Sequence, residues 1–137
     1  MFLYMDYERN AETEQIVWQI VAEIEDFEDI RIAQPKICVL DCSQPKKSEG
    51  RLIFADIKPV PEQYKALCDL DYIITVYTPN TALLSEAQFK ILLEHELRHV
   101  SITNGKKGIV YGTVGHDFED FYAIIDKYGM EWSAVDA

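Results

Sequence analysis

The pentapeptide His95–His99, with the sequence His-Glu-Leu-Arg-His, places the strongest constraint on how this chain folds. On an α-helix, which advances about 100° per residue, side chains four positions apart point only about 40° from each other. His95 and His99 can therefore share one metal ion if the segment is helical. Glu96 then projects beside that ion, where its carboxylate can take a proton from a water molecule. This combination is typical of zinc-assisted hydrolysis.

The residues before the pentapeptide predict the helix that it needs. Ser85 and Gln88 have the spacing of a capping box, and Glu86 adds negative charge where the helix dipole favours it. Apolar residues that recur at spacings of three and four then predict one stripe that packs against a core. The stripe consists of Phe89, Leu93, Leu97 and Val100. The two histidines lie off this stripe, so one side of the helix can enter a core while the other faces a cleft.

Two histidines at this spacing also arise by chance on ordinary amphipathic helices. The chain contains three histidines, and two of them make the motif, which favours a metal site. A catalytic zinc usually has three protein ligands and an open fourth position for water. His116 is the candidate for the third ligand, because the glycine-rich loop before it can fold back over the motif helix. Glu119 or Asp120 is a chemically acceptable substitute.

Several polar residues near the motif have more than one possible role. Arg98 borders the metal face of the helix, where it can bind a carboxylate near the metal, a substrate terminus or a surface partner. Asp117 can cap the last helix, and Asp120 can orient an imidazole by accepting its free N–H. Tyr77 and Tyr111 are candidates for a hydroxyl that stabilises the oxyanion formed during hydrolysis. The motif thus predicts a metal more firmly than it predicts the groups around it.

Length and charge narrow the class of protein. A chain of 137 residues, 48% hydrophobic and 27% charged, predicts a single globular domain over residues 1–137. The net charge of −11 argues against direct binding of nucleic acid, which requires clustered Lys and Arg. An acidic surface can favour basic substrates, although it more commonly serves solubility. The oligomeric state is left open.

The cysteines and the N-terminus indicate a cytoplasmic protein. Cys38, Cys42 and Cys68 are odd in number and contain no Cys-x-x-Cys pair, so we expect neither a disulfide framework nor a cysteine zinc site. Cys38 falls within an expected strand and is predicted to be a small buried residue. Residues 1–5 are apolar but too few for a signal peptide or a membrane span. We therefore expect reduced thiols and no membrane partner.

Hydrophobic periodicity predicts the remaining elements. Besides the motif helix, the expected helices cover residues 8–27 and 118–128, with one or two helical turns within 62–70. The expected strands cover residues 36–40, 51–58 and 71–78. Residues 101–115 are expected to form a glycine-containing loop with a small hairpin at 109–111. No internal repeat or interdomain linker interrupts this order.

The strand at 71–78 precedes the motif helix and allows two arrangements. At the edge of a sheet, its free backbone groups could pair with an extended peptide beside the cleft. In the centre of a sheet, neighbouring strands would occupy both of its edges. Both arrangements stay open at this point.

The second half of the chain resembles a known group of proteins. The resemblance is carried by the strand at 72–78, the segment 92–100 with the His-Glu-x-x-His motif, and the segments 116–121 and 128–132. These segments look like those of phage-type metallopeptidases, which are small zincins related to SprT-like proteins. One departure is Arg98, at a position where relatives often carry an apolar residue or a cysteine. It changes the polarity beside the site but not the ligands.

The resemblance implies an α+β, minimal zincin-like fold. Its parts are an N-terminal helix, a small sheet of three or slightly more strands, the metal-binding motif helix and a C-terminal helix. The resemblance also implies one zinc ion held by His95, His99 and His116, with Glu96 as the catalytic base.

The sequence therefore predicts a zinc-dependent peptidase that acts on a peptide or protein. One alternative is a zinc-stabilised protein-interaction module without activity, in which a side chain such as that of Asp120 closes the fourth position on the metal. A weaker alternative is an amidase or another hydrolase of non-peptide bonds, because the same metal and base serve either reaction.

Overall fold

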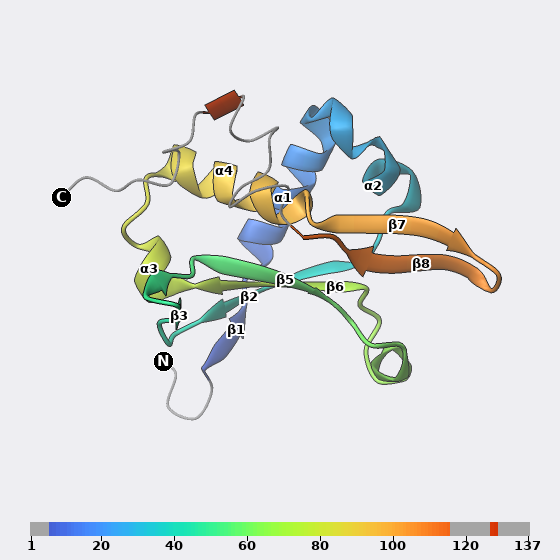
Figure 1. Cartoon of the computed structure of the whole chain (residues 1–137), viewed down its shortest axis with the longest axis horizontal. Coiled ribbons are helices and arrows are strands. Elements are labelled where there is room, and N and C mark those ends of the chain that lie inside the picture. The colour runs from blue at the N-terminus through green and yellow to red at the C-terminus, as the bar shows by residue number, and fades with distance from the viewer. Residues whose placement is uncertain (1–5, 116–126, 129–137) are drawn as a thin grey trace.

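The computed structural model describes residues 6–115 and 127–128. They form a mixed α+β fold in which helices cover one face of a small sheet, as Figure 1 shows. The predicted fold class, a small α+β zincin-like fold, is confirmed. In chain order the elements, with 3₁₀ helices labelled η, are β1 (Tyr7–Arg9), α1 (Ala11–Glu23), η1 (Glu25–Phe27), α2 (Glu28–Ala33), β2 (Ile37–Cys42), β3 (Lys47–Ser48), β4 (Arg51–Leu52), β5 (Ala55–Pro59), η2 (Glu62–Ala66), β6 (Tyr72–Tyr77), α3 (Thr78–Thr81), α4 (Glu86–Leu97), β7 (Val100–Gly105) and β8 (Gly108–Thr113).

Within the described residues, the main sheet has four strands in the order β1-β2-β6-β5. β6 runs parallel to β2 and antiparallel to β5, while β1 is antiparallel to β2. β6 is therefore a central strand with both edges occupied. Strand addition at residues 72–77, one of the two arrangements that the sequence allowed, is thus wrong, and the edge strand on that side is β5.

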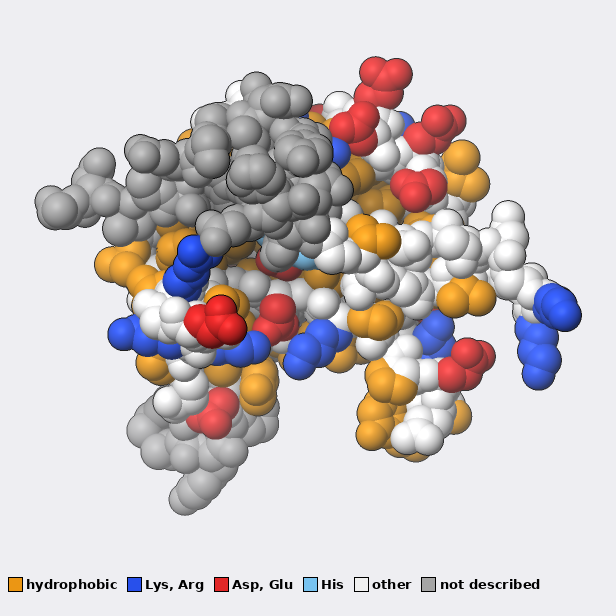
Figure 2. All heavy atoms as spheres, in the orientation of Figure 1, with side chains coloured by type: hydrophobic (Ala, Val, Ile, Leu, Met, Phe, Trp, Pro, Cys, Tyr) orange, Lys and Arg blue, Asp and Glu red, His pale blue; other side chains and the backbone are white. Residues whose placement is uncertain are grey.

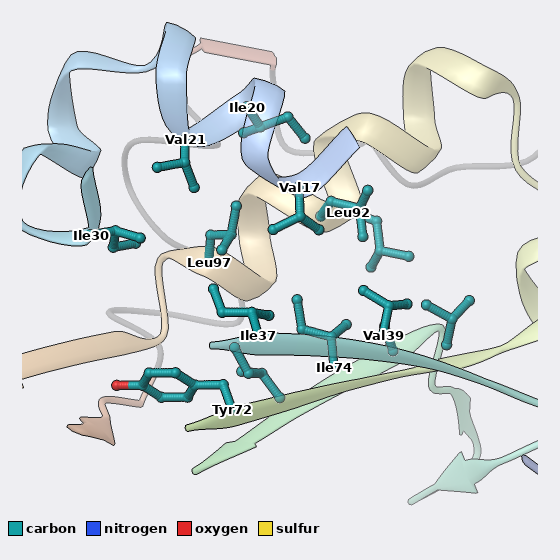
Figure 3. Packing of buried hydrophobic residues seen from close by; sticks show 14 of the residues in the cluster. Val17, Ile20, Val21, Ile30, Ile37, Val39, Tyr72, Ile74, Leu92 and Leu97 are labelled. Carbon is teal, nitrogen blue, oxygen red and sulfur yellow. The ribbon is translucent and has the colours of Figure 1, made fainter. Parts of the chain in front are cut away.

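The core lies between the sheet and the two longest helices, α1 and α4. Alternate residues of β6, Tyr72, Ile74 and Val76, are fully buried, as expected for a strand with one face on a core. Figure 3 shows the helices meeting this face through apolar side chains. The labelled contributors from α1, β2 and α4 include Val17, Ile20, Val21, Ile37, Val39, Leu92 and Leu97.

The N-terminal helix is shorter than predicted at both ends. Residues 7–9 pair with β2 as β1, and the Asn10 side chain then caps α1 by accepting from the backbone N–H of Thr13. At the other end, the Arg31 guanidinium donates to the carbonyls of Val21 and Ile24, where the chain turns away from the helix. The start of α1 is thus set by pairing with a distant strand, and its end by a turn of the chain that Arg31 stabilises. Hydrophobic periodicity reveals neither of these causes.

The expected strand at 51–58 is divided into β4 and β5. The two pieces have different partners: β4 pairs with β3, whereas β5 pairs with β6. The buried side chain of Asn80 binds the junction between them, because its amide donates to the carbonyls of Lys46 and Ile53. Asn80 belongs to α3, a short helix that the sequence did not predict.

The expected loop at 101–115 is largely a β-hairpin, longer than the 109–111 hairpin that was predicted. β7 and β8 pair in register from Val100 with Thr113 to Gly105 with Gly108. The turn needs glycine at its end, because Gly108 has a φ of +120°. Val100 therefore belongs to β7 and not to the stripe of the motif helix, which ends at Leu97.

All three cysteines are free thiols, as expected, and Cys38 is buried in β2. Among the described residues, no helix combines the length and the apolar run that crossing a membrane would require. The predicted last helix at 118–128 lies mostly outside the described residues. Its last two positions, 127–128, are described, and both are helical.

Candidate metal centre

The motif helix α4 begins at the predicted capping box. The Ser85 hydroxyl accepts from the Gln88 backbone N–H at 3.1 Å, and the Gln88 side chain accepts from the Ser85 N–H at 2.8 Å. Helical residues continue to Leu97, after which the backbone N–H of His99 donates to the carbonyl of Glu96 at 3.1 Å. This tight turn keeps His99 close to His95 even though the helix has ended.

The structure brings His95, Glu96 and His99 together. Their potential ligand atoms all lie within 4.8 Å of one another. The two imidazole rings are 5.3 Å apart between centroids and inclined by 65°. His95 is 8% exposed and Glu96 is 4% exposed, whereas His99 is partly exposed. The three side chains thus form a group that is mostly enclosed and open on the side of His99.

The imidazole of His99 is oriented by Val114, the residue directly after the hairpin. Its Nδ1 lies 2.6 Å from the carbonyl oxygen of Val114, and the Val114 N–H donates to the His99 carbonyl at 2.7 Å. A carbonyl can only accept, so the ring nitrogen facing it carries the hydrogen. In the neutral ring the other nitrogen, Nε2, then keeps a lone pair. The bond to Val114 thus favours the tautomer in which Nε2 of His99 can bind a metal.

The donor set fits a metal ion. Two imidazoles and a neighbouring carboxylate are groups that bind zinc and similar ions well. Burying polar side chains is costly unless they are partnered. Of the buried polar side chains that the structure describes, three are consecutive in α4: Glu94, His95 and Glu96. Such a concentration is typical of a functional site.

The remaining residues proposed for the site follow the hairpin in the sequence. His116, Glu119 and Asp120 lie outside the described residues, as does the suggested cap Asp117. Val114 and Gly115 are the last described positions before them.

Arg98 binds a carboxylate next to the motif, which was one of its three possible roles. Its guanidinium is 2.7 Å from Glu94 Oε2 and 2.9 Å from Asp26 Oδ2, and its side chain is only 11% exposed. Burial alone would lower the pKa of Arg98, but the hydrogen bonds with Glu94 and Asp26 outweigh it and raise that pKa. Arg98 is thus a structural cation inside the protein.

Sequence reasoning missed Glu94, the buried carboxylate that Arg98 binds. The two residues are four positions apart, which is the spacing of an ion pair on one helix face. That spacing was a usable signal, but it could not show that the pair is buried or that residues distant in sequence join it.

Tyr77 and Tyr111, the suggested oxyanion donors, have defined surroundings. The Tyr77 hydroxyl donates to Asp56 at 2.7 Å. Burial, and then this bond to Asp56, raises the pKa of Tyr77 to about 12. Its single proton is therefore committed to Asp56. The ring of Tyr111 packs edge-on against Tyr72, with 5.8 Å between centroids.

The metal-binding group has some contact with solvent, because His99 is partly exposed. In Figure 2 a small histidine surface appears near the middle of the molecule, next to an acidic side chain.

Comparison with known proteins extends the resemblance from the second half to nearly the whole chain. A family model described as "Putative phage metallopeptidase" matches residues 5–136. No curated protein and no solved structure matches the chain. The relation to SprT-like proteins stays a prediction. With a family match over almost its full length and a His-Glu-x-x-His group brought together in the structure, the chain belongs to the phage metallopeptidase family.

Proposed function

We propose that this protein is a zinc-dependent peptidase, formed as one domain over residues 1–137, whose metal is held by His95, His99 and His116. The observation that carries the proposal is the convergence of the ligand atoms of His95, Glu96 and His99 within 4.8 Å on a mostly buried site. The family supports it, because metallopeptidases act on peptides or proteins through a bound metal.

Chain connectivity supports His116 as the third ligand. Val114 is held at His99 by two hydrogen bonds, at 2.6 and 2.7 Å. Two residues of extended chain span at most about 7 Å. The position two residues after Val114 is therefore within reach of the same site, whereas Glu119 and Asp120 are separated from this anchor by more chain.

Glu96 serves as the general base in the proposed reaction. A bound zinc would polarise the substrate carbonyl and lower the pKa of water. The Glu96 carboxylate takes a proton from the attacking water as the water oxygen forms a bond to the carbonyl carbon. It then delivers that proton to the amide nitrogen as the carbon–nitrogen bond breaks. A buried carboxylate on the helix between the two histidines is suited to both steps.

The edge strand β5 offers a place for an extended substrate. Phe54 O accepts from Tyr77 N–H at 2.9 Å and Val60 N–H donates to Asp71 O at 2.8 Å, so these backbone groups face β6. In an antiparallel ladder the facing groups alternate. The backbone groups of Ala55 and Ile57 are therefore directed to the other side of β5, which the described residues do not extend into a further strand. α4 packs on β5, so a peptide paired there would run beside the motif helix.

The test compares cleavage of a mixed peptide pool by the zinc-loaded wild type, Glu96→Gln and Glu86→Gln. Glu86 is an exposed acid in the first turn of the same helix, so its variant is a matched control. Loss of a general base is expected to slow turnover by about 10²- to 10⁴-fold, while Glu86→Gln stays near wild type. Equal turnover by wild type and Glu96→Gln would remove Glu96 from the mechanism. A wild type that binds zinc tightly, loses stability on chelation and cuts nothing would favour the interaction module.

A further inference from the structure

The carboxylate of Glu94 binds Arg98 and residues 127–128, and through Arg98 it is linked to η1. It is 2% exposed, yet both of its oxygens are occupied. Oε1 accepts from the Tyr128 hydroxyl at 2.7 Å and lies 3.5 Å from Lys127 Nζ. Oε2 accepts from the Arg98 guanidinium at 2.7 Å, and Arg98 in turn contacts Asp26 of η1. One buried side chain of α4 therefore joins the helix to η1 and to residues 127–128.

Glu94 is a neighbour of the metal-binding group but not a member of it. Within the described residues, the group whose ligand atoms converge is His95, Glu96 and His99. On a helix, Glu94 projects about 140° away from His99, five positions later, whereas Glu96 projects only about 60° away from it. Any effect of Glu94 on a metal must therefore act through what it holds in place.

Glu94 holds residues 127–128 at one end of the His95–His99 motif, and the other end is held as well. Val114 is bound to His99 by its N–H and its carbonyl. Tyr128 and Lys127 are bound to Glu94. Two later parts of the chain, Val114 and residues 127–128, are thus bound to the part of α4 that carries the ligand side chains. Partners of this kind restrain a metal site and keep its ligand side chains in the geometry that a metal needs.

We propose that Glu94 is a positioning residue for the metal centre: its carboxylate docks residues 127–128 on α4 and thereby strengthens metal binding. The inference rests on the proposed function, because it takes zinc to be the ion bound. A purely stabilising role would leave the zinc affinity of folded protein unchanged. The positioning role instead predicts that docking strengthens zinc binding in protein that is already folded.

Tyr128→Phe is the sharpest variant, because it removes only the hydroxyl that binds Glu94 Oε1. Tyr64→Phe is the matched control, since Tyr64 is an exposed tyrosine in η2. Zinc dissociation constants are measured by competition with a chromophoric chelator, at a temperature where circular dichroism shows each protein to be folded. Disrupting partners that orient a metal site typically weakens affinity 10- to 100-fold. We expect about tenfold weaker binding for Tyr128→Phe and none of this loss for Tyr64→Phe.

Glu94→Gln extends the test, with a larger expected loss of zinc affinity because the anionic partner of Lys127 and Arg98 is removed. If this variant does not fold, Tyr128→Phe alone decides. The visible spectrum of the cobalt-substituted protein gives a second readout, expected to change for Tyr128→Phe and to stay unchanged for Tyr64→Phe.

The outcomes separate this inference from the function on which it rests. A wild type that binds zinc while Tyr128→Phe binds it equally well, with an unchanged cobalt spectrum, overturns the positioning role and leaves the peptidase proposal standing. Lower stability of metal-free Tyr128→Phe with unchanged zinc affinity also overturns the positioning role. A wild type that binds no zinc overturns both proposals.

Discussion

Helices α1 and α4 have similar lengths and pack on the same sheet, but they bury different residues. α1 buries one side, at Val17, Ile20 and Val21, and directs Glu12 and other acids outward. α4 buries every residue from Leu92 to Leu97, on all sides of the helix. The first pattern is what the hydrophobic effect alone produces on a surface helix.

The second pattern needs another cause, because half of that buried stretch is ionisable. Leu92, Leu93 and Leu97 enter the core, whereas Glu94, His95 and Glu96 bring polar groups out of water. Burying charge is unfavourable unless specific partners compensate it. Glu94 has such partners in Arg98 and Tyr128, and the neighbouring histidine and glutamate belong to the group that fits a metal ion. The difference between the helices therefore separates a packing element from a functional one.

Zinc binding is expected to have the largest effect on the stability of the protein. At a free zinc concentration about a thousand times its Kd, binding should stabilise the wild type by about 4 kcal/mol. His95→Ala should abolish this gain, because it removes one of the two imidazoles of the group. Thermal or urea unfolding with zinc and with chelator measures the difference. A gain that persists in His95→Ala would place the ion elsewhere.

Ile20→Ala tests the opposite helix. The side chain is buried in the core between α1 and the sheet, so its truncation should cost about 3 kcal/mol through lost burial and a cavity. Because Ile20 is not part of the metal-binding group, the added stability from zinc should stay at the wild-type value. Urea unfolding with and without zinc gives both quantities, and a lost zinc response would show that the two helices are not functionally separate.

Ser85→Ala should have a smaller effect. It removes the side-chain half of the capping box that starts α4, at a cost of about 1 kcal/mol. Chemical denaturation of the metal-free protein measures it. Since the cap lies at the far end of the helix from the histidines, zinc affinity should be unchanged, and a large loss of affinity would mean that the helix start positions the site.

The smallest predicted effect is a pH-dependent one on α1. The hydrogen bond from Arg9 holds the pKa of Glu14 below its ordinary value, against the effect of burial. A carboxyl with a lowered folded pKa stabilises the fold above its unfolded pKa of about 4.3, and this contribution disappears as the pH falls through the folded value. Because the Arg9 side chain is exposed to solvent, Glu14→Gln should cost about 0.5 kcal/mol at pH 7 and progressively less as the solution is acidified through that range.

The control for this pH effect is Glu12→Gln, an exposed acid in the same helix. It should show no comparable pH dependence in urea unfolding. A Glu14→Gln penalty that stays constant from neutral pH to strong acid would contradict the assignment to the Arg9 bond.

Local signals explain which parts of the fold were predictable. The capping box at Ser85 and the β-branched run of β6 act through near neighbours in sequence, and both elements occur where they were predicted. By contrast, β1 exists only because residues 7–9 pair with residues 40–42 of β2, far along the chain. The central position of β6 depends likewise on the order in which distant strands pair.

The same distinction between local signals and long-range contacts applies to the metal-binding group and its neighbours. The spacing of His95, Glu96 and His99 is a local property, and the structure brings these side chains together. Glu94 was missed because Asp26, Lys127 and Tyr128, which join it and Arg98, come from remote segments. Hydrophobic periodicity assigns apolar residues to the core but does not identify a carboxylate that is buried because distant groups neutralise it.

X-ray absorption of the zinc-loaded protein tests the metal-binding role of α4 most directly. We predict one zinc per chain with nitrogen and oxygen ligands only, including imidazole scattering from at least two histidines, at about 2.0 to 2.2 Å. Zinc bound without imidazole ligands, or the absence of stoichiometric zinc, would contradict the assignment of α4 as a metal-binding helix.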